Sequence, residues 1–166
     1  MFGGFDISWT TKLTFFCDVD WASNADRKSM SSYVVLFAGG AVTWSAKKQS
    51  TIALSMAKAE YIAATHVAKQ VLWHRTFCEE LSFPQPTTST IFCDNQAAIA
   101  IAHHPEFHAR TKHIDIAMHF LRDLVESRMI NIIYVPSCEN LADLFTKRLA
   151  RPLHMELTYG VGVMLE

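Results

Sequence analysis

Two apolar, β-prone segments of this chain each run directly into a carboxylate. The first, "FFCDVDWA" over residues 15–22, carries Asp18, and the second, "IFCDN" over residues 91–95, carries Asp94. Residues of these types favour strands with at least one buried face. A buried carboxylate without a partner is costly, so each acid must lie exposed at a strand end, pair with another group or bind a cation. Any fold for this chain has to place the ends of both strands where the two acids are exposed, paired or bound to a cation.

The rest of the pattern predicts one α/β domain. Strands are predicted at residues 12–19, 33–37, 41–46, 90–93 and 130–135, and helices at about 54–81, 95–102, 114–126 and 141–149. An antiparallel meander of three strands followed by crossover connections gives a five-stranded mixed sheet flanked by helices. We assign residues 1–11 to an N-terminal extension, 12–150 to the domain, and 151–166 to a tail or a docked helix.

Composition excludes several classes of protein. With 166 residues, half of them hydrophobic, the chain is long enough to bury a core and is not disordered. No apolar run approaches the roughly 20 residues of a membrane span, and the N-terminus has no signal-peptide pattern. The expected location is the cytoplasm, a virus-like particle or the nucleus. The net charge is −1, but if four of the 16 acids gather at one metal site, the 15 Lys and Arg outnumber the rest and are free to meet an anion.

The cysteines and large aromatic residues are interpreted as structural. The four cysteines are widely spaced, without a CxxC pair, which argues against a zinc site and gives no support for a disulfide framework. Cys17 and Cys93 are predicted to be small core hydrophobes. The aromatic residues predicted to build the core are Tyr33, Trp21, Trp44 and Trp73.

Two further acids lie on predicted helices. Glu60 is near the start of the long helix, and Asp143 opens the last one. Taken singly, each has a structural alternative: Asp18 and Asp94 as strand-end turn residues, Glu60 and Asp143 as acids that favour a helix N-terminus. Taken together, they would meet where parallel strands end, at the edge of an α/β sheet that binds ligands. Oxygen-only clusters suit Mg²⁺, and two such ions would activate a water and stabilise the leaving oxygen of a phosphodiester.

The chain resembles the ribonuclease H domain of copia-type LTR retrotransposon polyproteins. The matching motifs run in order from about residue 17 to 152: "CDVDWA", "DRKSMSSYVV", "TWSAKKQSTIALSMAKAEYIA", "IFCDNQAAIAIA", "HARTKHIDI" and "YVPSCENLADLFTK". The resemblance implies the ribonuclease H-like fold and cleavage of the RNA strand of RNA–DNA hybrids, with Mg²⁺ as cofactor and Mn²⁺ as a substitute. It also implies reverse transcriptase and integrase portions of a polyprotein as partners.

The resemblance carries over to particular residues. The catalytic, metal-binding acids fall on Asp18, Glu60, Asp94 and Asp143. Asp20 and Asp26 also match acidic positions, but we assign them no ligand role. Many cellular ribonucleases H carry a Gly-His loop just before the last acid. Residues 135–140, "VPSCEN", contain no His, so the assisting base is unassigned.

Basic and polar residues outside the acid cluster are candidates for holding the hybrid. The predicted nucleic-acid-binding residues are Arg27, Lys28, Lys48, Ser55, Asn95, Gln96, Arg110 and Lys112. Several Lys and Arg that neutralise phosphates provide sequence-independent binding, and amide or hydroxyl groups can contact sugar hydroxyls. A solvated surface is the alternative for each basic cluster, and a core or capping role is favoured over catalysis for His113. The alternative function is a catalytically silent module that binds hybrid. A related exonuclease is disfavoured, because such enzymes have Asp-x-Glu where this chain has Asp18-Val19-Asp20.

Overall fold

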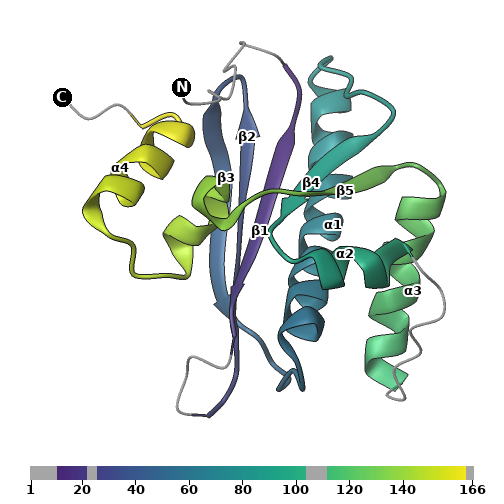
Figure 1. The fold of residues 1–166 in the computed structure, drawn as a ribbon. Helices are drawn as coiled ribbons and strands as arrows, with labels where there is room; N and C mark the ends of the chain where they lie inside the picture. The colour runs from purple at the N-terminus through teal and green to yellow at the C-terminus, as the bar shows by residue number, and fades with distance from the viewer. Residues whose placement is uncertain (1–10, 22–25, 104–111, 164–166) are drawn as a thin grey trace.

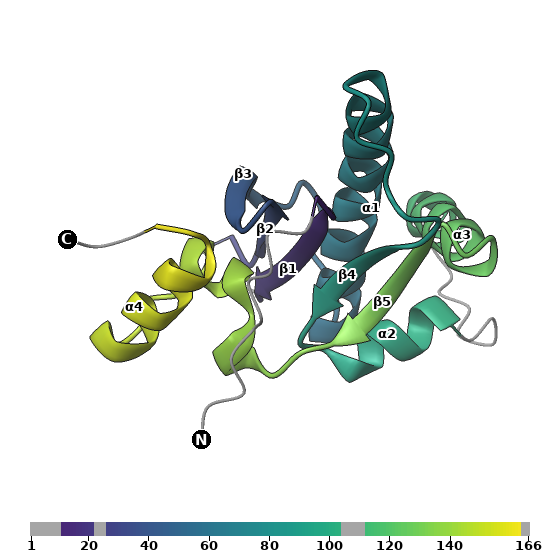
Figure 2. The ribbon, with the colours of Figure 1, turned by 90° about the horizontal axis from the view of Figure 1, so that it is seen from above.

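The computed structural model describes residues 11–21, 26–103 and 112–163, and all their side chains except those of 112–118. Its centre is a five-stranded sheet in the order β3-β2-β1-β4-β5 (Figures 1 and 2). The strands are β1 (Thr14–Asp20), β2 (Met30–Phe37), β3 (Gly40–Lys48), β4 (Ser89–Cys93) and β5 (Ile130–Tyr134). β1, β2 and β3 pair antiparallel, whereas β1, β4 and β5 pair parallel. The predicted mixed sheet is confirmed.

Helices cover both faces of the sheet. They are α1 (Met56–Glu80), α2 (Gln96–His103), α3 (Lys112–Glu126) and α4 (Arg151–Gly160), with two short 3₁₀ helices, η1 (Ser137–Glu139) and η2 (Leu141–Phe145). The long helix α1 lies behind the sheet in the view of Figure 1, and α4 lies to one side with η2 (Figures 1 and 2). The predicted bounds of α1 are correct to within two residues at each end.

Side-chain alternation along β1 builds a core on each face of the sheet. Phe15 and Cys17 belong to a buried cluster that includes Val67 of α1, whereas Phe16 packs in a second cluster with Leu157 of α4. Strand residues alternate between faces, so Asp18 shares the face of Phe16. Asp18 therefore points toward the side of the sheet that carries η2, and α1 lies on the opposite side.

The C-terminal part of the chain differs from the predicted helix over 141–149. That segment forms only the 3₁₀ helix η2, and helical structure resumes in α4. The amide N–H groups of both Thr146 and Lys147 donate to the carbonyl of Asp143, so the chain turns tightly here instead of continuing as an α-helix. Residues Arg151–Gly160 form α4, which packs against η2.

Three of the four aromatic residues predicted for the core are exposed. Tyr33 is buried, but Trp21 is 43%, Trp44 59% and Trp73 57% exposed, so that prediction was wrong for the tryptophans. Trp44 lies on the edge strand β3, and Trp73 stacks on Phe77 along the outside of α1. Alternation and helical spacing identify a face, but not whether a second layer covers it.

Two other features of the fold bear on the sequence analysis. Cys17 and Cys93 are buried, and neither forms a disulfide, as predicted for small core residues. In the described part of the chain, no helix combines the length and the apolar character needed to cross a lipid bilayer.

Candidate metal centre

Asp18 lies near the end of β1 and is completely buried. Its carboxylate accepts a hydrogen bond from the hydroxyl of Thr146 and one from Lys147 Nζ, which is 3.0 Å from Oδ1. Both donors come from the turn that follows η2, on the face of the sheet to which Asp18 points. A buried carboxylate on this strand is thus paired with a cation from a distant part of the chain.

Asp143 is held beside Asp18 by the residues that begin η2. The Asn140 side chain donates from Nδ2 to the carbonyl of Cys17 at 2.9 Å and accepts from the N–H of Ala142 at its Oδ1. The hydroxyl of Ser32 on β2 donates to the carbonyl of Ala142 at 2.8 Å. These bonds attach η2 to β1 and β2, one residue from Asp143.

Asp94 follows the last residue of β4 and joins the other acids through the strand register. Cys17 pairs with Cys93 across the parallel strands, so the next residues, Asp18 within β1 and Asp94 just after β4, lie side by side at the same end of these strands. The hydroxyl of Ser137 donates to Asp94 Oδ2 at 2.6 Å. Lys147 Nζ lies 3.8 Å from the same oxygen and 2.9 Å from Asp143 Oδ2, so one ammonium group contacts three carboxylates.

Glu60 approaches from the other side of the sheet, on α1. It is completely buried, and within the described residues neither of its carboxylate oxygens has a hydrogen-bond partner. Helix α1 places this residue in its second turn, after the Ser55 hydroxyl has capped the helix by accepting from the N–H of Lys58.

Asp94 is shared by two groups of potential metal ligands. In one group, single oxygens of Asp18, Asp94 and Asp143 lie within 4.8 Å of one another; in the other, the same limit holds for Glu60, Asp94 and the thiol of Cys93. The structure thus brings together all four acids predicted from the sequence, in two overlapping sets of three ligands.

Burial and mutual repulsion alter the protonation of these acids. Burial raises the pKa of Glu60 to about 10, and Cys93, Asp18 and Asp94 add to the effect. Burial and the charge of Asp18 raise the pKa of Asp143 to about 7, although Lys147 opposes the shift. Burial disfavours the charged form of Lys147, but the carboxylates of Asp18 and Asp143 outweigh it and raise its pKa. The cluster thus has more carboxylates than Lys147 alone can balance, and it holds protons that a divalent cation would displace.

Unsatisfied oxygens indicate where a cation fits. In the part of the chain that the structure describes, the buried carboxylate oxygens without a hydrogen bond are both oxygens of Glu60, Asp94 Oδ1 and Asp143 Oδ1. Buried polar atoms are normally paired, and unpaired ones need an explanation such as a bound ion. Carboxylate oxygens are the ligands that Mg²⁺ prefers. The residues present therefore fit a hard divalent cation.

The predicted nucleic-acid-binding residues are in varied environments. Lys48 forms a 3.0 Å ion pair with Asp26, and Arg27 is exposed. Asn95 Oδ1 accepts from the N–H of Ala98 at the start of α2, and Gln96 is exposed. Ser55, as noted, caps α1, and Lys28 is partly exposed. Arg110 and the side chains of Lys112 and His113 lie outside the described residues.

The residues that hold the acids in place were not predicted from the sequence. No role was predicted for four residues that all fall within the motif "YVPSCENLADLFTK": Ser137, Asn140, Thr146 and Lys147. A signal was available for Lys147, because an acid and a lysine four residues apart, as in Asp143 and Lys147, are suitably spaced to pair. No comparable signal linked Thr146 to Asp18.

Comparison with known proteins supports one lineage and one fold. The chain is 39% identical over 151 residues to the retrovirus-related Pol polyprotein from transposon TNT 1-94 of Nicotiana tabacum, a match covering 90% of this chain. It spans 11% of the length of that polyprotein and of two from Arabidopsis thaliana, transposons RE1 and RE2. No protein-family model matches the chain.

Solved structures with low sequence identity share the fold. The N-terminal RNase H domain of rv2228c from Mycobacterium tuberculosis is 12% identical and superposes with a TM-score of 0.57, covering 90% of this chain and 98% of that one. LC11-RNase H1 in complex with RNA/DNA hybrid is also 12% identical, with a TM-score of 0.57, and covers 81% of this chain and 94% of that one.

Proposed function

We propose a function for this chain from its family: it belongs to the copia-type retrotransposon Pol polyproteins, over the segment that has the ribonuclease H fold. The proposed activity is metal-dependent hydrolysis of the RNA strand of RNA–DNA hybrids, as in reverse transcription. The observation that carries the proposal is the convergence of Asp18, Glu60, Asp94 and Asp143, from four separate elements, on one edge of the sheet.

Mg²⁺ is the proposed cofactor, with Mn²⁺ as a substitute. Asp18, Asp94 and Asp143 would hold one ion, and Glu60 with Asp94 would contribute to a second, because Asp94 is common to both groups. Bound metal would supply a water activated for attack and would stabilise the oxygen that leaves the phosphodiester.

The chain's own residues orient the carboxylates. The hydroxyls of Ser137 and Thr146 fix one oxygen each of Asp94 and Asp18 by hydrogen bonds. Of their second oxygens, Asp18 Oδ1 accepts from Lys147 Nζ, and Asp94 Oδ1 has no hydrogen-bond partner among the described residues. Lys147 partly balances the negative charge of the cluster while no cation is bound. Preorganised ligands of this kind avoid rearrangement when the metal enters.

The substrate would be held through its backbone. We propose that the basic residues Arg27, Lys28, Lys48, Arg110 and Lys112 contact phosphates and that Ser55, Asn95 and Gln96 contact the RNA sugar edge. The solved complex of LC11-RNase H1 with an RNA/DNA hybrid supports a hybrid as the partner of this fold. We propose reverse transcriptase and integrase portions of a polyprotein as partners. The proposed location is the cytoplasm, a virus-like particle or the nucleus.

The test is incubation with a labelled RNA–DNA hybrid, with Mg²⁺ and with a chelator. Wild-type protein should cut the RNA only when metal is present and should spare duplex DNA. Asp94→Asn removes the ligand that both groups share and should reduce cleavage to background while hybrid is still bound.

Two outcomes would contradict the proposal. Substantial cleavage by Asp94→Asn would remove Asp94 from the ligand set. Hybrid binding by the wild-type protein without cleavage at any metal concentration would favour the alternative, a silent binding module.

A further inference from the structure

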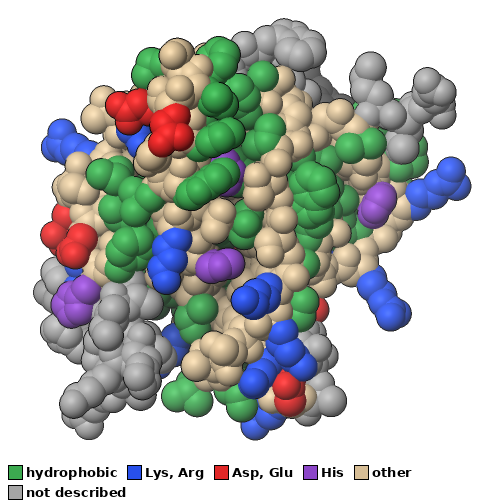
Figure 3. Space-filling model, turned by 180° about the vertical axis from the view of Figure 1, so that it is seen from behind, with side chains coloured by type: hydrophobic (Ala, Val, Ile, Leu, Met, Phe, Trp, Pro, Cys, Tyr) green, Lys and Arg blue, Asp and Glu red, His purple; other side chains and the backbone are tan. Residues whose placement is uncertain are grey.

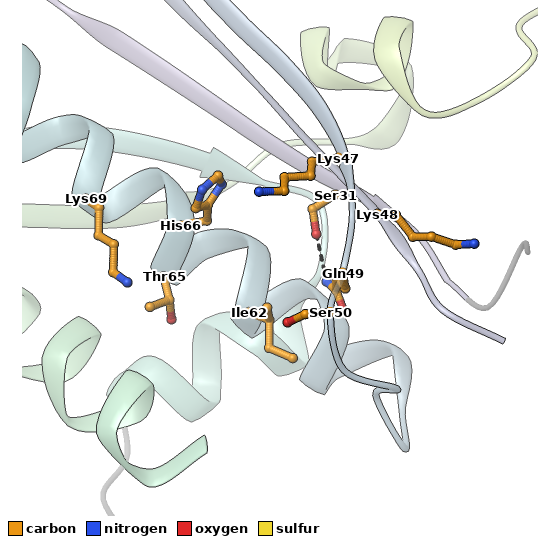
Figure 4. A pocket seen from close by; sticks show the side chains of 9 residues that line it. All are labelled: Ser31, Lys47, Lys48, Gln49, Ser50, Ile62, Thr65, His66 and Lys69. Atoms are coloured by element: carbon orange, nitrogen blue, oxygen red, sulfur yellow. Dashed lines mark hydrogen bonds between the residues drawn. The ribbon is translucent and has the colours of Figure 1, made fainter. Parts of the chain in front are cut away.

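A cavity lies along α1, apart from the four acids. It is a cavity of about 270 Å³ between the middle of α1 and the ends of β2 and β3 (Figure 4). Ser31 and Lys47 line it from the sheet, and Ile62, His66 and Lys69 line it from the helix. The acids are not among its lining residues, so it is separate from the candidate metal centre.

The charge lining this cavity is positive. No carboxylate is among its lining residues, and Lys48, which points away from the cavity in Figure 4, is paired with Asp26. Burial lowers the pKa of His66, and the charges of Lys47 and Lys69 lower it further. Lys69 Nζ lies 6.0 Å from the centre of the Phe120 ring. From behind, Lys and Arg side chains gather around a His side chain on this side of the molecule (Figure 3). Two cations here lack an anion among the described residues.

The polar groups around the cavity include several hydrogen-bond donors. Ser31 Oγ accepts from Gln49 Nε2 at 2.7 Å, so its own hydrogen is available to another acceptor. The His66 ring packs edge-on against Tyr33 at 5.9 Å between centroids, which limits its rotation. Lys47 extends toward His66 in Figure 4. Ammonium, imidazole and hydroxyl donors around one hollow match an anion with several acceptor oxygens.

Gln49 connects this cavity to the metal centre. It is 6% exposed, and its Nε2 donates both to Ser31 Oγ and, at 2.9 Å, to the carbonyl of Ala59, the residue before Glu60. His66 follows Glu60 by six residues on α1, which corresponds to about 9 Å along the helix axis. These bonds and the shared helix therefore hold the cavity in a fixed position relative to Glu60.

We propose that the cavity lined by Ser31, Lys47, His66 and Lys69 binds a backbone phosphate of the nucleic acid, away from the phosphate that is cut. The inference rests on the proposed function, because it assigns this phosphate to the hybrid. The contact positions the duplex without reading its sequence, since phosphates are the same at every step. Inorganic phosphate shares the chemistry, so both sources are compared in the test.

The direct test observes the ring of His66 by NMR in metal-free protein, where hybrid is not cut. The protein is titrated with a short RNA–DNA hybrid and, separately, with inorganic phosphate. We expect the His66 signals to move at low hybrid concentration and only at much higher phosphate concentration. A response to inorganic phosphate without a response to hybrid would overturn the assignment to nucleic acid, and no response to either would overturn the site.

The second test measures how hybrid affinity depends on salt, again without metal. Losing one phosphate contact should lower the slope of log affinity against log salt by about 0.9. We expect this change for Lys69→Gln and for Lys47→Gln, and recovery of the wild-type slope in Lys69→Arg, which keeps the charge. Lys12→Gln is the matched control, because Lys12 is exposed at the opposite end of β1 from Asp18.

The two tests separate this inference from the proposed activity. If Lys69→Gln has the same slope as Lys12→Gln while wild-type protein cuts hybrid, the cavity is not a phosphate site and the nuclease proposal stands. If the slope falls and His66 responds, but no hybrid is cut under any condition, the phosphate site stands and the nuclease proposal fails.

Discussion

Replacing Glu60 with Gln should change how the stability of the metal-free protein depends on pH. Glu60 is fully buried, and its pKa rises from an ordinary 4.5 to about 10 in the folded chain. Between these values the folded protein holds a proton that the unfolded chain has lost. The contribution of Glu60 to the stability of the folded protein is therefore fully present below about pH 4.5, and it is lost as the pH rises toward 10.

The magnitude follows from proton linkage. One proton corresponds to about 1.4 kcal/mol of unfolding free energy per pH unit, so Glu60 accounts for a loss of roughly 3 kcal/mol between pH 6 and pH 8. Gln has nearly the same shape but does not titrate. Its unsatisfied amide lowers stability equally at both pH values, so that cost cancels in the comparison.

The assay is urea unfolding of both proteins at pH 6 and pH 8 with a chelator present. The difference in unfolding free energy between Glu60→Gln and wild type should shift by roughly 3 kcal/mol in favour of the variant at pH 8. Asp143, whose pKa is also raised, remains in both proteins and largely cancels. Parallel pH profiles would refute the reasoning, because they would mean that Glu60 is ionised without metal.

Three further predictions concern cations. Millimolar Mg²⁺ should raise the melting temperature of the wild-type protein by mass action, and Asp18→Asn should reduce that gain; an equal gain in both would exclude Asp18 as a ligand. Lys147→Met removes the ammonium that contacts Asp18 and Asp143, so it should destabilise the metal-free protein by about 1–3 kcal/mol. The variant should also be stabilised more by Mg²⁺ than the wild-type protein is. A smaller stabilisation by Mg²⁺, measured by calorimetry, would show that Lys147 assists metal binding. Arg110→Ala with Lys112→Ala should flatten the salt dependence of hybrid binding by roughly one to two units of slope while cleavage at saturating hybrid stays near wild type; an unchanged slope would indicate solvated charges.

The sequence predicted the sheet because its strands are short, apolar and separated by clear turn signals. It also predicted the acid cluster, because the ends of β1 and β4 must lie together once these strands pair in parallel. Asp18 could be placed near Asp94 on this reasoning alone. The positions of Glu60 and Asp143 followed from the family resemblance as well as from their helices.

The contacts around the cluster could not be predicted in the same way. Thr146 reaches Asp18 because η2 is a tight 3₁₀ turn, whereas the apolar pattern of 141–149 favoured an α-helix that would have rotated this side chain elsewhere. The exposure of Trp44 and Trp73 was missed for a related reason. Periodicity assigns residues to a face, but the layer that covers the face is a property of the whole fold.

The bond from Asn140 to the backbone of β1 implies an order of events during synthesis. It joins residues 123 positions apart, and Lys147 meets Asp18 across 129 positions. A chain emerging from the ribosome can pair β1 with β2, and β2 with β3, early, since these strands are neighbours in sequence. Asp18, Glu60 and Asp94 all precede η2 in the chain, so the fourth acid arrives only when η2 has been translated and has docked. A growing chain therefore acquires its complete set of acids late in the synthesis of the domain, after all five strands of the sheet have been made.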